Sequence, residues 1–159
     1  MNTNALALCD FYMVSDASLL DLPAIRRLEQ ACFPKDAYDF FTLLNLALSR
    51  NVLRLKAMVD NRLVGYLAGE VRDYDATGWV VTLGVLPSHT GCGIGHALLA
   101  SAERAMKARV TYVKLTVRRS NAQAIRLYDH CGYKWVSTIR GYYHDGEDGL
   151  IMEKNLTLA

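Results

Sequence analysis

Hydrophobic positions along this chain recur with two different periods, and the change of period separates predicted helices from predicted strands. Within residues 22–32 the positions that recur at spacings of three and four, as on one face of a helix, are Leu22, Ile25, Leu28, Glu29 and Cys32, until Phe33 and Pro34 interrupt the pattern. Residues 40–49 are strongly apolar and predict a second helix. A further helix is predicted over residues 94–107, where small apolar side chains form a narrow stripe.

Runs rich in β-branched residues predict the strands. Residues 54–59 and 63–72 are separated by a short polar turn and predict a hairpin. The other predicted elements are strands over residues 10–14, 77–85, 113–117, 134–139 and 149–153 and a helix over residues 121–131, with Ser15 and Asp16 as candidate caps after the first strand. This order predicts a mixed α/β fold with a largely antiparallel sheet, in a single domain over residues 1–159.

Composition narrows the class of protein. With 159 residues and a 52% apolar fraction, the chain is expected to bury one core. Its net charge of +2 is too small and too evenly spread to indicate a nucleic-acid-binding face. The apolar runs have the length of strands and the first ten residues lack the features of a secretory signal, so we expect no membrane contact and a cytoplasmic protein.

The cysteines and histidines indicate neither a disulfide framework nor a metal site. Cys9, Cys32, Cys92 and Cys131 show no CxxC spacing, and we expect them to be reduced thiols. The four histidines lie on different predicted elements without the spacing of a zinc site, so no metal is expected.

Residues 79–99 predict a strand that enters a helix through a glycine-rich turn. Gly91, Gly93 and Gly95 lack Cβ atoms, so consecutive backbone N–H groups are able to point at one anion. The dipole of the following helix favours negative charge at the same place. The segment therefore predicts a site for a phosphate-bearing ligand.

Two common phosphate-binding motifs do not fit this turn. The nucleoside triphosphate loop requires a lysine after its last glycine, and no lysine follows Gly95. The dinucleotide fingerprint requires GxGxxG after the first strand, whereas this turn has the spacing GxGxG and lies deep in the chain. A simpler alternative stays open, in which the glycines only permit a tight entry into the helix.

Several spaced motifs follow one another in this order: Leu83-Gly-Val-Leu-Pro87, Thr90-Gly-Cys-Gly-Ile-Gly95, Val117-Arg-Arg-Ser-Asn121, Ala124-Ile-Arg-Leu-Tyr128, Cys131-Gly-Tyr133 and Tyr142-Tyr-His-Asp-Gly-Glu-Asp148. Together they resemble the GNAT acetyltransferases, and within them the members that acetylate the N-terminal amine of a ribosomal protein. The resemblance is dense from about residue 64 to residue 155. It implies a GNAT fold, with a splayed, mostly antiparallel sheet of seven strands flanked by about four helices.

The resemblance implies that acetyl-CoA is the acyl donor. Its pantetheine arm would pair with the backbone of residues 83–85, and its pyrophosphate would lie on the N–H groups of the glycine turn. The residues expected to contact the cofactor are Leu83, Gly84, Val85, Thr90, Gly91, Cys92, Gly93, Ile94, Gly95, His96, Asn121 and Tyr128. Asn121 also fits the N-cap of the helix that follows it. Relatives usually carry Arg or Gln at the site of Thr90, so we expect modest cofactor affinity.

The resemblance also implies that an amine attacks the thioester directly, without an acyl-enzyme. A backbone N–H near Val85 would stabilise the tetrahedral oxyanion, and Tyr128 would protonate the leaving sulfur of coenzyme A. The alternative for Tyr128 is a tyrosine that only packs its helix on the sheet. Cys92 has no neighbouring base and is interpreted as a loop residue rather than a nucleophile.

The general base is the point at which this sequence departs from the family. Thr116 stands where related enzymes carry a glutamate, and a neutral hydroxyl does not hold a proton near neutral pH. An α-amine with a pKa of about 7.8 is deprotonated more easily than a lysine with a pKa of about 10.4, by about 3.5 kcal/mol. The sequence therefore favours an α-amine acceptor, with its proton removed by solvent or by a water that Thr116 holds together with Glu70 or Glu153.

The acceptor site is expected between the first two helices and the segment after the sixth strand. Phe33, Tyr142 and Tyr143 are candidate acceptor-binding residues, the tyrosines as an aromatic wall for the amine. The acidic residues of the same segment, which would attract a cationic amine, are Asp145, Glu147 and Asp148. A surface loop before an edge strand explains these residue types equally well.

We therefore expect an acetyltransferase that moves acetyl from acetyl-CoA to a primary amine, in the first place the N-terminal α-amine of a protein. One alternative is an acetyltransferase for a small amine such as a polyamine, an amino acid or an aminoglycoside. The other is a non-catalytic acyl-CoA-binding module. The expected assembly is a monomer or a homodimer.

Overall fold

In the computed structural model, which describes residues 11–158, seven strands and four α-helices follow one another along the chain. The strands are β1 (Met13–Asp16), β2 (Val52–Val59), β3 (Arg62–Arg72), β4 (Thr77–Val85), β5 (Tyr112–Arg118), β6 (Lys134–Ile139) and β7 (Gly149–Asn155). The helices are α1 (Leu22–Cys32), α2 (Phe40–Leu48), α3 (Ile94–Met106) and α4 (Ala122–His130). The predicted mixed α/β class is confirmed.

The strands form a single sheet in the order β1-β2-β3-β4-β5-β7-β6. β1 pairs antiparallel with β2, and β7 pairs antiparallel with both β5 and β6. β4 and β5 pair parallel, from Thr77 opposite Tyr112 to Val80 opposite Leu115. This confirms the predicted seven-stranded, mostly antiparallel sheet, while the splay of residues 83–85 stays a prediction.

The chain is organised in two compact units. The first contains the residues up to Gly69 and Thr82–Ala102, and the second contains Glu70–Val81 and the residues from Glu103 onward. β3, β4 and α3 each run from one unit into the other. The single domain over residues 1–159 stays a prediction.

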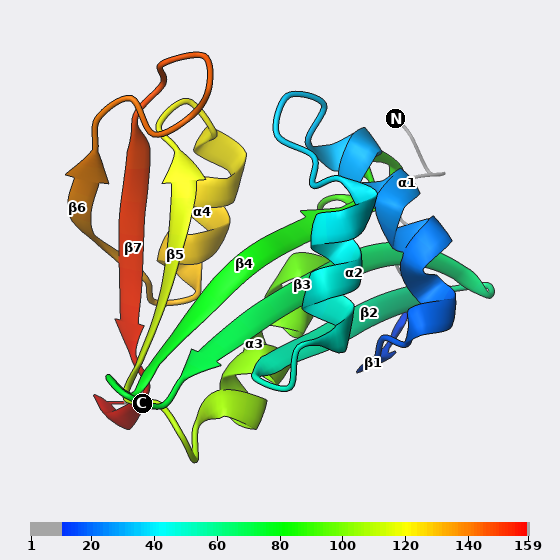
Figure 1. The fold of residues 1–159 in the computed structure, drawn as a ribbon, viewed down its shortest axis with the longest axis horizontal. Coiled ribbons are helices and arrows are strands. Elements are labelled where there is room, and N and C mark those ends of the chain that lie inside the picture. Colours follow the sequence, from blue (N-terminus) through cyan, green and yellow to red (C-terminus); the bar gives the residue numbers. More distant parts are fainter. Residues whose placement is uncertain (1–10, 159) are drawn as a thin grey trace, which may run out of the picture. The chain divides into compact units, whose positions relative to one another are not determined.

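The first unit packs helices on both faces of β2 and β3 (Figure 1). The stripe of α1 buries Ile25 and Leu28, and α2 buries Leu43. Each such side chain stabilises the fold by roughly 1.5–3 kcal/mol relative to an exposed one. α1 ends at Cys32, as the sequence predicts, because its C-cap Phe33 precedes Pro34 and the residue before a proline disfavours helical dihedrals.

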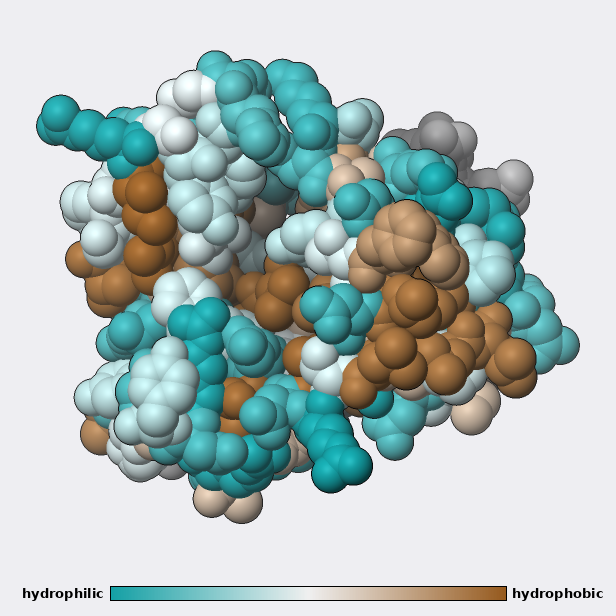
Figure 2. Space-filling model, in the orientation of Figure 1, coloured by the Kyte–Doolittle hydropathy of each residue, from teal (hydrophilic) through white to brown (hydrophobic). Residues whose placement is uncertain are grey.

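α2 is the most apolar of the four described helices, yet Leu43 is its only buried residue. Phe41 is 78% exposed and Leu48 is 61% exposed. Figure 2 shows hydrophobic residues gathered over this helix. Among residues 11–158, no helix is both long enough and apolar enough to cross a membrane.

The predicted hairpin is formed by β2 and β3. Asp60 and Asn61 connect the strands with φ of 47° and 60°. Two consecutive left-handed residues are typical of a type I′ hairpin turn, which aspartate and asparagine tolerate better than other non-glycine residues. The observed turn is therefore one residue shorter than the predicted one, and Arg62 belongs to β3.

β1 lies later in the chain than predicted. Ser15 and Asp16, expected as caps, pair with Lys56 and Leu55 of β2. The expectation was wrong because cross-strand pairing to β2 outweighs the local preference of serine and aspartate for caps. Asp10, the predicted start of this strand, lies outside the described residues.

The second unit is built on β7, which pairs with β5 on one side and β6 on the other. Its core contains Met106, Leu115, Tyr133 and Met152, each no more than 3% exposed. α4 leaves this sheet after β5 and starts at a capped N-terminus. The side chain of Asn121 accepts a hydrogen bond from the backbone N–H of Ala124 at 3.1 Å, which confirms its predicted role as N-cap.

Candidate active site

The glycine-rich turn lies in the first unit, between β4 and α3. Gly91 and Gly93 have φ of 81° and 79°, a region that residues with a Cβ rarely adopt. Among residues 11–158, a Cβ on Gly91 would meet no heavy atom within 4 Å, and one on Gly93 would come no closer than 3.8 Å, to the Tyr12 hydroxyl. Glycine is therefore required by the backbone conformation rather than by crowding from residues 11–158.

The start of α3 anchors this turn. The side chain of Ile94 is 1% exposed and belongs to the core, and the carbonyl of Gly93 accepts the N–H of Ala97 at 3.0 Å. Thr90 and His96, by contrast, are exposed on either side of the turn. Ile94 therefore offers a ligand only its backbone, whereas the turn presents the N-terminus of a helix of 13 residues.

The end of β4 is fixed by α1. A Cβ on Gly84 would lie 3.0 Å from Leu28 Cδ2 and 3.2 Å from Cys32 Sγ. The Cys32 thiol donates a hydrogen bond to the Val85 carbonyl at 3.3 Å, and burial, followed by the charge of Glu29, raises the pKa of this thiol to about 11. The predicted pantetheine segment therefore has a defined backbone position next to α1.

Glu29 is a buried carboxyl group that the sequence pattern placed on the apolar face of α1. It is 1% exposed. The Thr82 hydroxyl of β4 donates to its Oε1 at 2.5 Å, and the N–H of Tyr38 donates to its Oε2 at 3.5 Å. Burial raises the pKa of this carboxyl, and the two hydrogen bonds oppose that shift. Glu29 therefore connects α1 to β4 and to the segment that leads into α2.

Glu29→Gln is expected to change the pH dependence of stability. The raised pKa means that the folded protein disfavours the ionised acid, so wild-type stability falls as pH rises from the ordinary glutamate pKa through the raised one. Glutamine keeps an acceptor for Thr82 and does not ionise. As the pH rises through this window, the free energy of unfolding of the variant should increase relative to that of wild type and then stay constant. The increase should be about 1.4 kcal/mol for each tenfold difference between the ionisation constants of Glu29 in the unfolded and the folded protein.

Urea unfolding across this pH range measures the effect. Glu29→Ala, which cannot accept the Thr82 hydroxyl, should be less stable than wild type at every pH. If the difference in free energy of unfolding between wild type and Glu29→Gln does not change with pH, the expectation is contradicted.

Tyr128 lies on α4 in the second unit and is 7% exposed. Its ring centroid is 6.0 Å from that of Tyr133. Burial is the largest cause that raises its pKa, and the nearby Tyr143 and Cys131 raise it further. Tyr128 is thus packed, as the simpler alternative expects, and it also stays protonated, which a proton donor requires.

Thr116 and Tyr142 meet above Gly149 of β7. A Cβ on Gly149 would lie 2.8 Å from Thr116 Cγ2 and 3.1 Å from Tyr142 Cβ. Gly149 is itself opposite Arg118 in the β5–β7 register. The absence of a side chain at this position lets a predicted catalytic residue and a predicted acceptor-binding residue approach each other. Within the second unit, Tyr143 also acts electrostatically on Tyr128 and raises its pKa.

Both carboxylates considered as partners of a catalytic water take part in ion pairs. Glu70 lies 2.9 Å from Arg72, whose guanidinium is 5.1 Å from the Trp79 ring centroid. Glu153 lies 3.2 Å from Lys114, which faces it across β5 and β7. Both carboxylates are therefore already paired with a cation of the protein.

The predicted acceptor residues fall in two places. Phe33 is half-buried at the end of α1, and its carbonyl accepts N–H groups of Asp36 and Ala37 at 3.1 and 2.7 Å. Tyr142 is 52% exposed on the β6–β7 loop, with its ring centroid 5.0 Å from that of Tyr143. The acidic residues of that loop already bind protein groups: Asp145 and Glu147 pair with Arg118, and Asp148 pairs with Arg119.

The prediction that all cysteines are reduced is wrong for Cys92, which is disulfide-bonded. Cys32 and Cys131 carry free thiols, and Cys9 lies outside the described residues. The sequence shows no CxxC spacing at Cys92 that would have indicated this bond. Among residues 11–158, no group of three or more His, Cys, Asp or Glu side chains is arranged to hold a metal ion.

Comparison with known proteins places this site in a family. A model of the "Acetyltransferase (GNAT) family" matches residues 22–133. An N-alpha-acetyltransferase of Sulfurisphaera tokodaii is 31% identical over 153 residues, which cover 89% of this chain and 91% of the relative.

Solved structures agree with this match. The ribosomal-protein-S18-alanine N-acetyltransferase of Escherichia coli has a TM-score of 0.83 at 26% identity, covering 94% of this chain and 96% of its own. Arabidopsis thaliana NAA60, solved in complex with acetyl-CoA, shares the fold with a TM-score of 0.83 at 18% identity, covering 92% and 99%. The chain therefore belongs to the GNAT family of acetyltransferases, as the motifs of its sequence predict.

Proposed function

We propose that this enzyme transfers the acetyl group of acetyl-CoA to the N-terminal α-amine of a protein. The observation that carries the proposal is the turn at Gly91 and Gly93, which leads into the N-terminus of α3. The coenzyme diphosphate would lie on the backbone N–H groups of this turn, where the helix dipole favours its charge. The relatives named for α-amine and ribosomal-protein alanine acetylation support the acceptor class.

The proposed reaction needs no covalent enzyme intermediate. The neutral amine attacks the thioester carbonyl, the C–N bond forms, and the electron pair of the broken C–S bond leaves with sulfur. Tyr128 gives its proton to that sulfur. Because burial raises the pKa of Tyr128, transfer to a free thiolate is uphill, and we expect the proton to move as the C–S bond breaks.

Thr116 stands where related enzymes carry a carboxylate, and this difference favours one class of acceptor amine. Since Glu70 and Glu153 are engaged in ion pairs, solvent is the proposed proton acceptor, aided by a water at the Thr116 hydroxyl. This arrangement suits an amine that is partly neutral before it binds. An α-amine meets that condition, whereas a lysine would cost about 3.5 kcal/mol more to deprotonate.

The β6–β7 loop supports recognition of an uncharged amine. Its carboxylates are satisfied by Arg118, Arg119 and Ser120, so they add little attraction for a cation. Tyr142 is the exposed aromatic residue of this loop and is the proposed wall of the acceptor site. The cytoplasmic location and the monomeric or homodimeric state predicted from the sequence remain predictions.

A coenzyme A release assay tests this function. With acetyl-CoA, a peptide with a free α-amine should react at least about 100-fold faster than the same peptide with a blocked N-terminus and a free lysine, because of the difference in amine pKa. The rate should rise with pH until the α-amine is neutral, near pH ~7.8.

Polyamines and aminoglycosides serve as the competing acceptors in the same assay. Faster turnover of a small amine than of every peptide would replace the protein acceptor by a small-molecule acceptor. Tight binding of acetyl-CoA with no turnover of any amine would indicate a binding module instead.

A further inference from the structure

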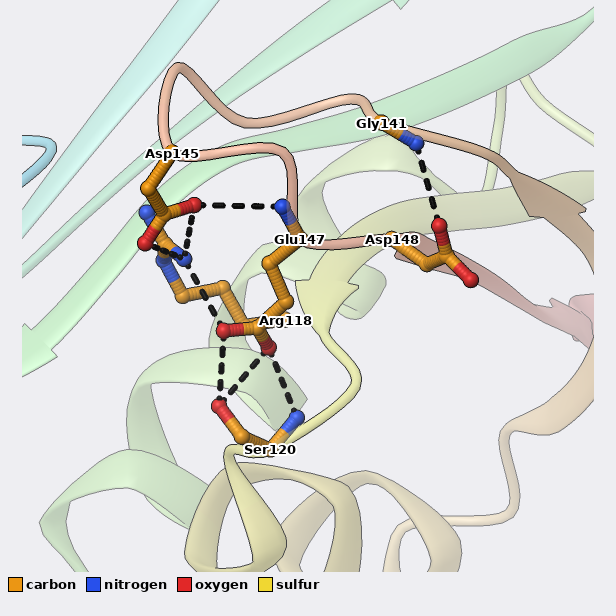
Figure 3. Close-up of polar contacts among 6 residues, drawn as sticks. All are labelled: Arg118, Ser120, Gly141, Asp145, Glu147 and Asp148. Atoms are coloured by element: carbon orange, nitrogen blue, oxygen red, sulfur yellow. Dashed lines mark hydrogen bonds and ion pairs between the residues drawn. The ribbon is translucent and has the colours of Figure 1, made fainter.

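Arg118 is the last residue of β5, and its side chain is only 14% exposed. Its Nη1 donates to both carboxylate oxygens of Asp145 at 3.0 Å and to Glu147 Oε1 at 3.0 Å. Figure 3 shows this guanidinium between the two acids of the β6–β7 loop, residues 140–148. One cation therefore joins the end of a central strand to two points of the loop.

The same acids tie the loop to itself and to the start of α4. Glu147 accepts the N–H of Ser120 at 2.8 Å and its hydroxyl at 2.7 Å, and the N–H of Glu147 donates to Asp145 at 3.2 Å (Figure 3). Hydrogen bonds from Ser120 are the largest cause that lowers the pKa of Glu147, so it stays ionised. The carboxylate of Asp148 accepts the N–H of Gly141 at 3.0 Å, which closes the base of the loop.

The guanidinium also contacts an aromatic residue of the loop. The Cζ atom of Arg118 lies 4.1 Å from the ring centroid of Tyr143, within the range of a cation–π interaction. The Tyr143 ring is nearly perpendicular to that of Tyr142, at 86°, and Tyr143 is near enough to Tyr128 to raise its pKa. Contacts thus run from Arg118 through Tyr143 to Tyr142, and Tyr143 acts electrostatically on Tyr128.

We propose that Arg118 is a positioning residue that fixes the β6–β7 loop, so that Tyr142 and Tyr143 hold the acceptor amine in its reacting orientation next to Tyr128. This inference rests on the proposed function, because it assigns the loop to the acceptor side of the reaction. Arg118 itself touches neither cofactor nor reacting atoms in this role.

The cluster favours arginine over lysine. Nη1 of Arg118 donates to both carboxylates while the planar guanidinium lies over the Tyr143 ring, so one residue binds two acids and a ring at the same time. A lysine at this position would keep the charge but would lose the flat surface that contacts the ring.

Steady-state kinetics of Arg118→Met, Arg118→Lys and Arg119→Met tests the inference. We expect Arg118→Met to lower kcat/KM for the acceptor peptide about 100-fold, the cost of a displacement of about 1 Å in a positioned reactant. The KM for acetyl-CoA should stay within about twofold, because the glycine turn is unchanged. Arg118→Lys should recover about tenfold of the loss, since it restores the charge alone.

Arg119→Met is the matched control. Arg119 is the neighbouring arginine, its side chain is 67% exposed, and it pairs with Asp148 only at the surface, so we expect less than a threefold change. Equal effects at Arg118 and Arg119, or normal acceptor kinetics in folded Arg118→Met, would overturn the positioning role. A rise in the KM for acetyl-CoA equal to that for the peptide would indicate a general structural effect and would also overturn it.

Limited chymotrypsin digestion separates this inference from the proposed function. Arg118→Met should speed cleavage after Tyr142 and Tyr143 at least about tenfold, because loss of these contacts opens the loop locally. If wild type is inactive and resists cleavage while Arg118→Met is cleaved quickly, the proposed function is refuted, but Arg118 still fixes the β6–β7 loop. If wild type is active and both proteins are cleaved at the same rate, Arg118 does not fix the loop.

Discussion

Replacing Tyr128 by phenylalanine is expected to lower kcat by about 100- to 10,000-fold, the range that a single general acid contributes. Without the phenol, coenzyme A must leave as an unprotonated thiolate. The phenylalanine ring keeps the packing beside Tyr133, so the affinity for acetyl-CoA and the fold should change little. Single-turnover release of coenzyme A and titration with acetyl-CoA measure the two quantities separately.

Tyr133→Phe is the control for the loss of a buried phenol near the same helix. The Tyr133 hydroxyl donates to Glu103 at 3.0 Å, and Lys154 also binds that carboxylate at 2.8 Å. We expect this variant to lose about 1 kcal/mol of stability and to keep its kcat. If Tyr128→Phe turns over at the wild-type rate, Tyr128 only packs α4 and another group protonates the sulfur.

Gly93→Ala is expected to weaken acetyl-CoA binding about 10- to 100-fold. The left-handed backbone at Gly93 costs a residue with a Cβ about 1–2 kcal/mol, and relaxation of this strain turns the N–H groups away from the diphosphate. Residues 11–158 leave room for the methyl group, because their nearest atom, the Tyr12 hydroxyl oxygen, is 3.8 Å away. Isothermal titration with acetyl-CoA measures the change.

Gly132→Ala provides the matched comparison. Gly132 also has a positive φ, 93°, and a Cβ there would make an ordinary contact with Lys154 at 3.5 Å. Gly132→Ala should reduce stability about as much as Gly93→Ala does and leave the affinity for acetyl-CoA unchanged. Equal affinities in the two variants would mean that the turn at Gly91 and Gly93 does not hold the coenzyme.

Local preferences determined most of the elements and the family. The turn between β4 and α3 was predictable because only glycine adopts its dihedral angles freely, and this requirement is visible in the residue types themselves. The cap at Asn121 was predictable for the same reason, since its partner is three residues away. The spaced motifs that identify the GNAT family also need no tertiary knowledge.

The sequence could not reveal how the charged groups are used, because their partners are far away along the chain. Glu29 was read as part of the apolar stripe of α1, and its partner Thr82 lies 53 residues later. The acidic residues after β6 suggested attraction of a cationic amine, whereas Arg118 of β5 already neutralises two of them. The disulfide at Cys92 was also missed, because no paired cysteine spacing indicated it.

The sequence by itself thus determined an acetyltransferase fold and the glycine turn between β4 and α3, since dihedral preferences and motif order act over a few residues, and the diphosphate site on that turn stays a prediction. Only the tertiary structure determined which ionisable groups form ion pairs or hydrogen bonds with one another and which side chains approach each other over Gly149. Those choices depend on the register of β5, β7 and the β6–β7 loop, and register is set by the packing of the whole sheet.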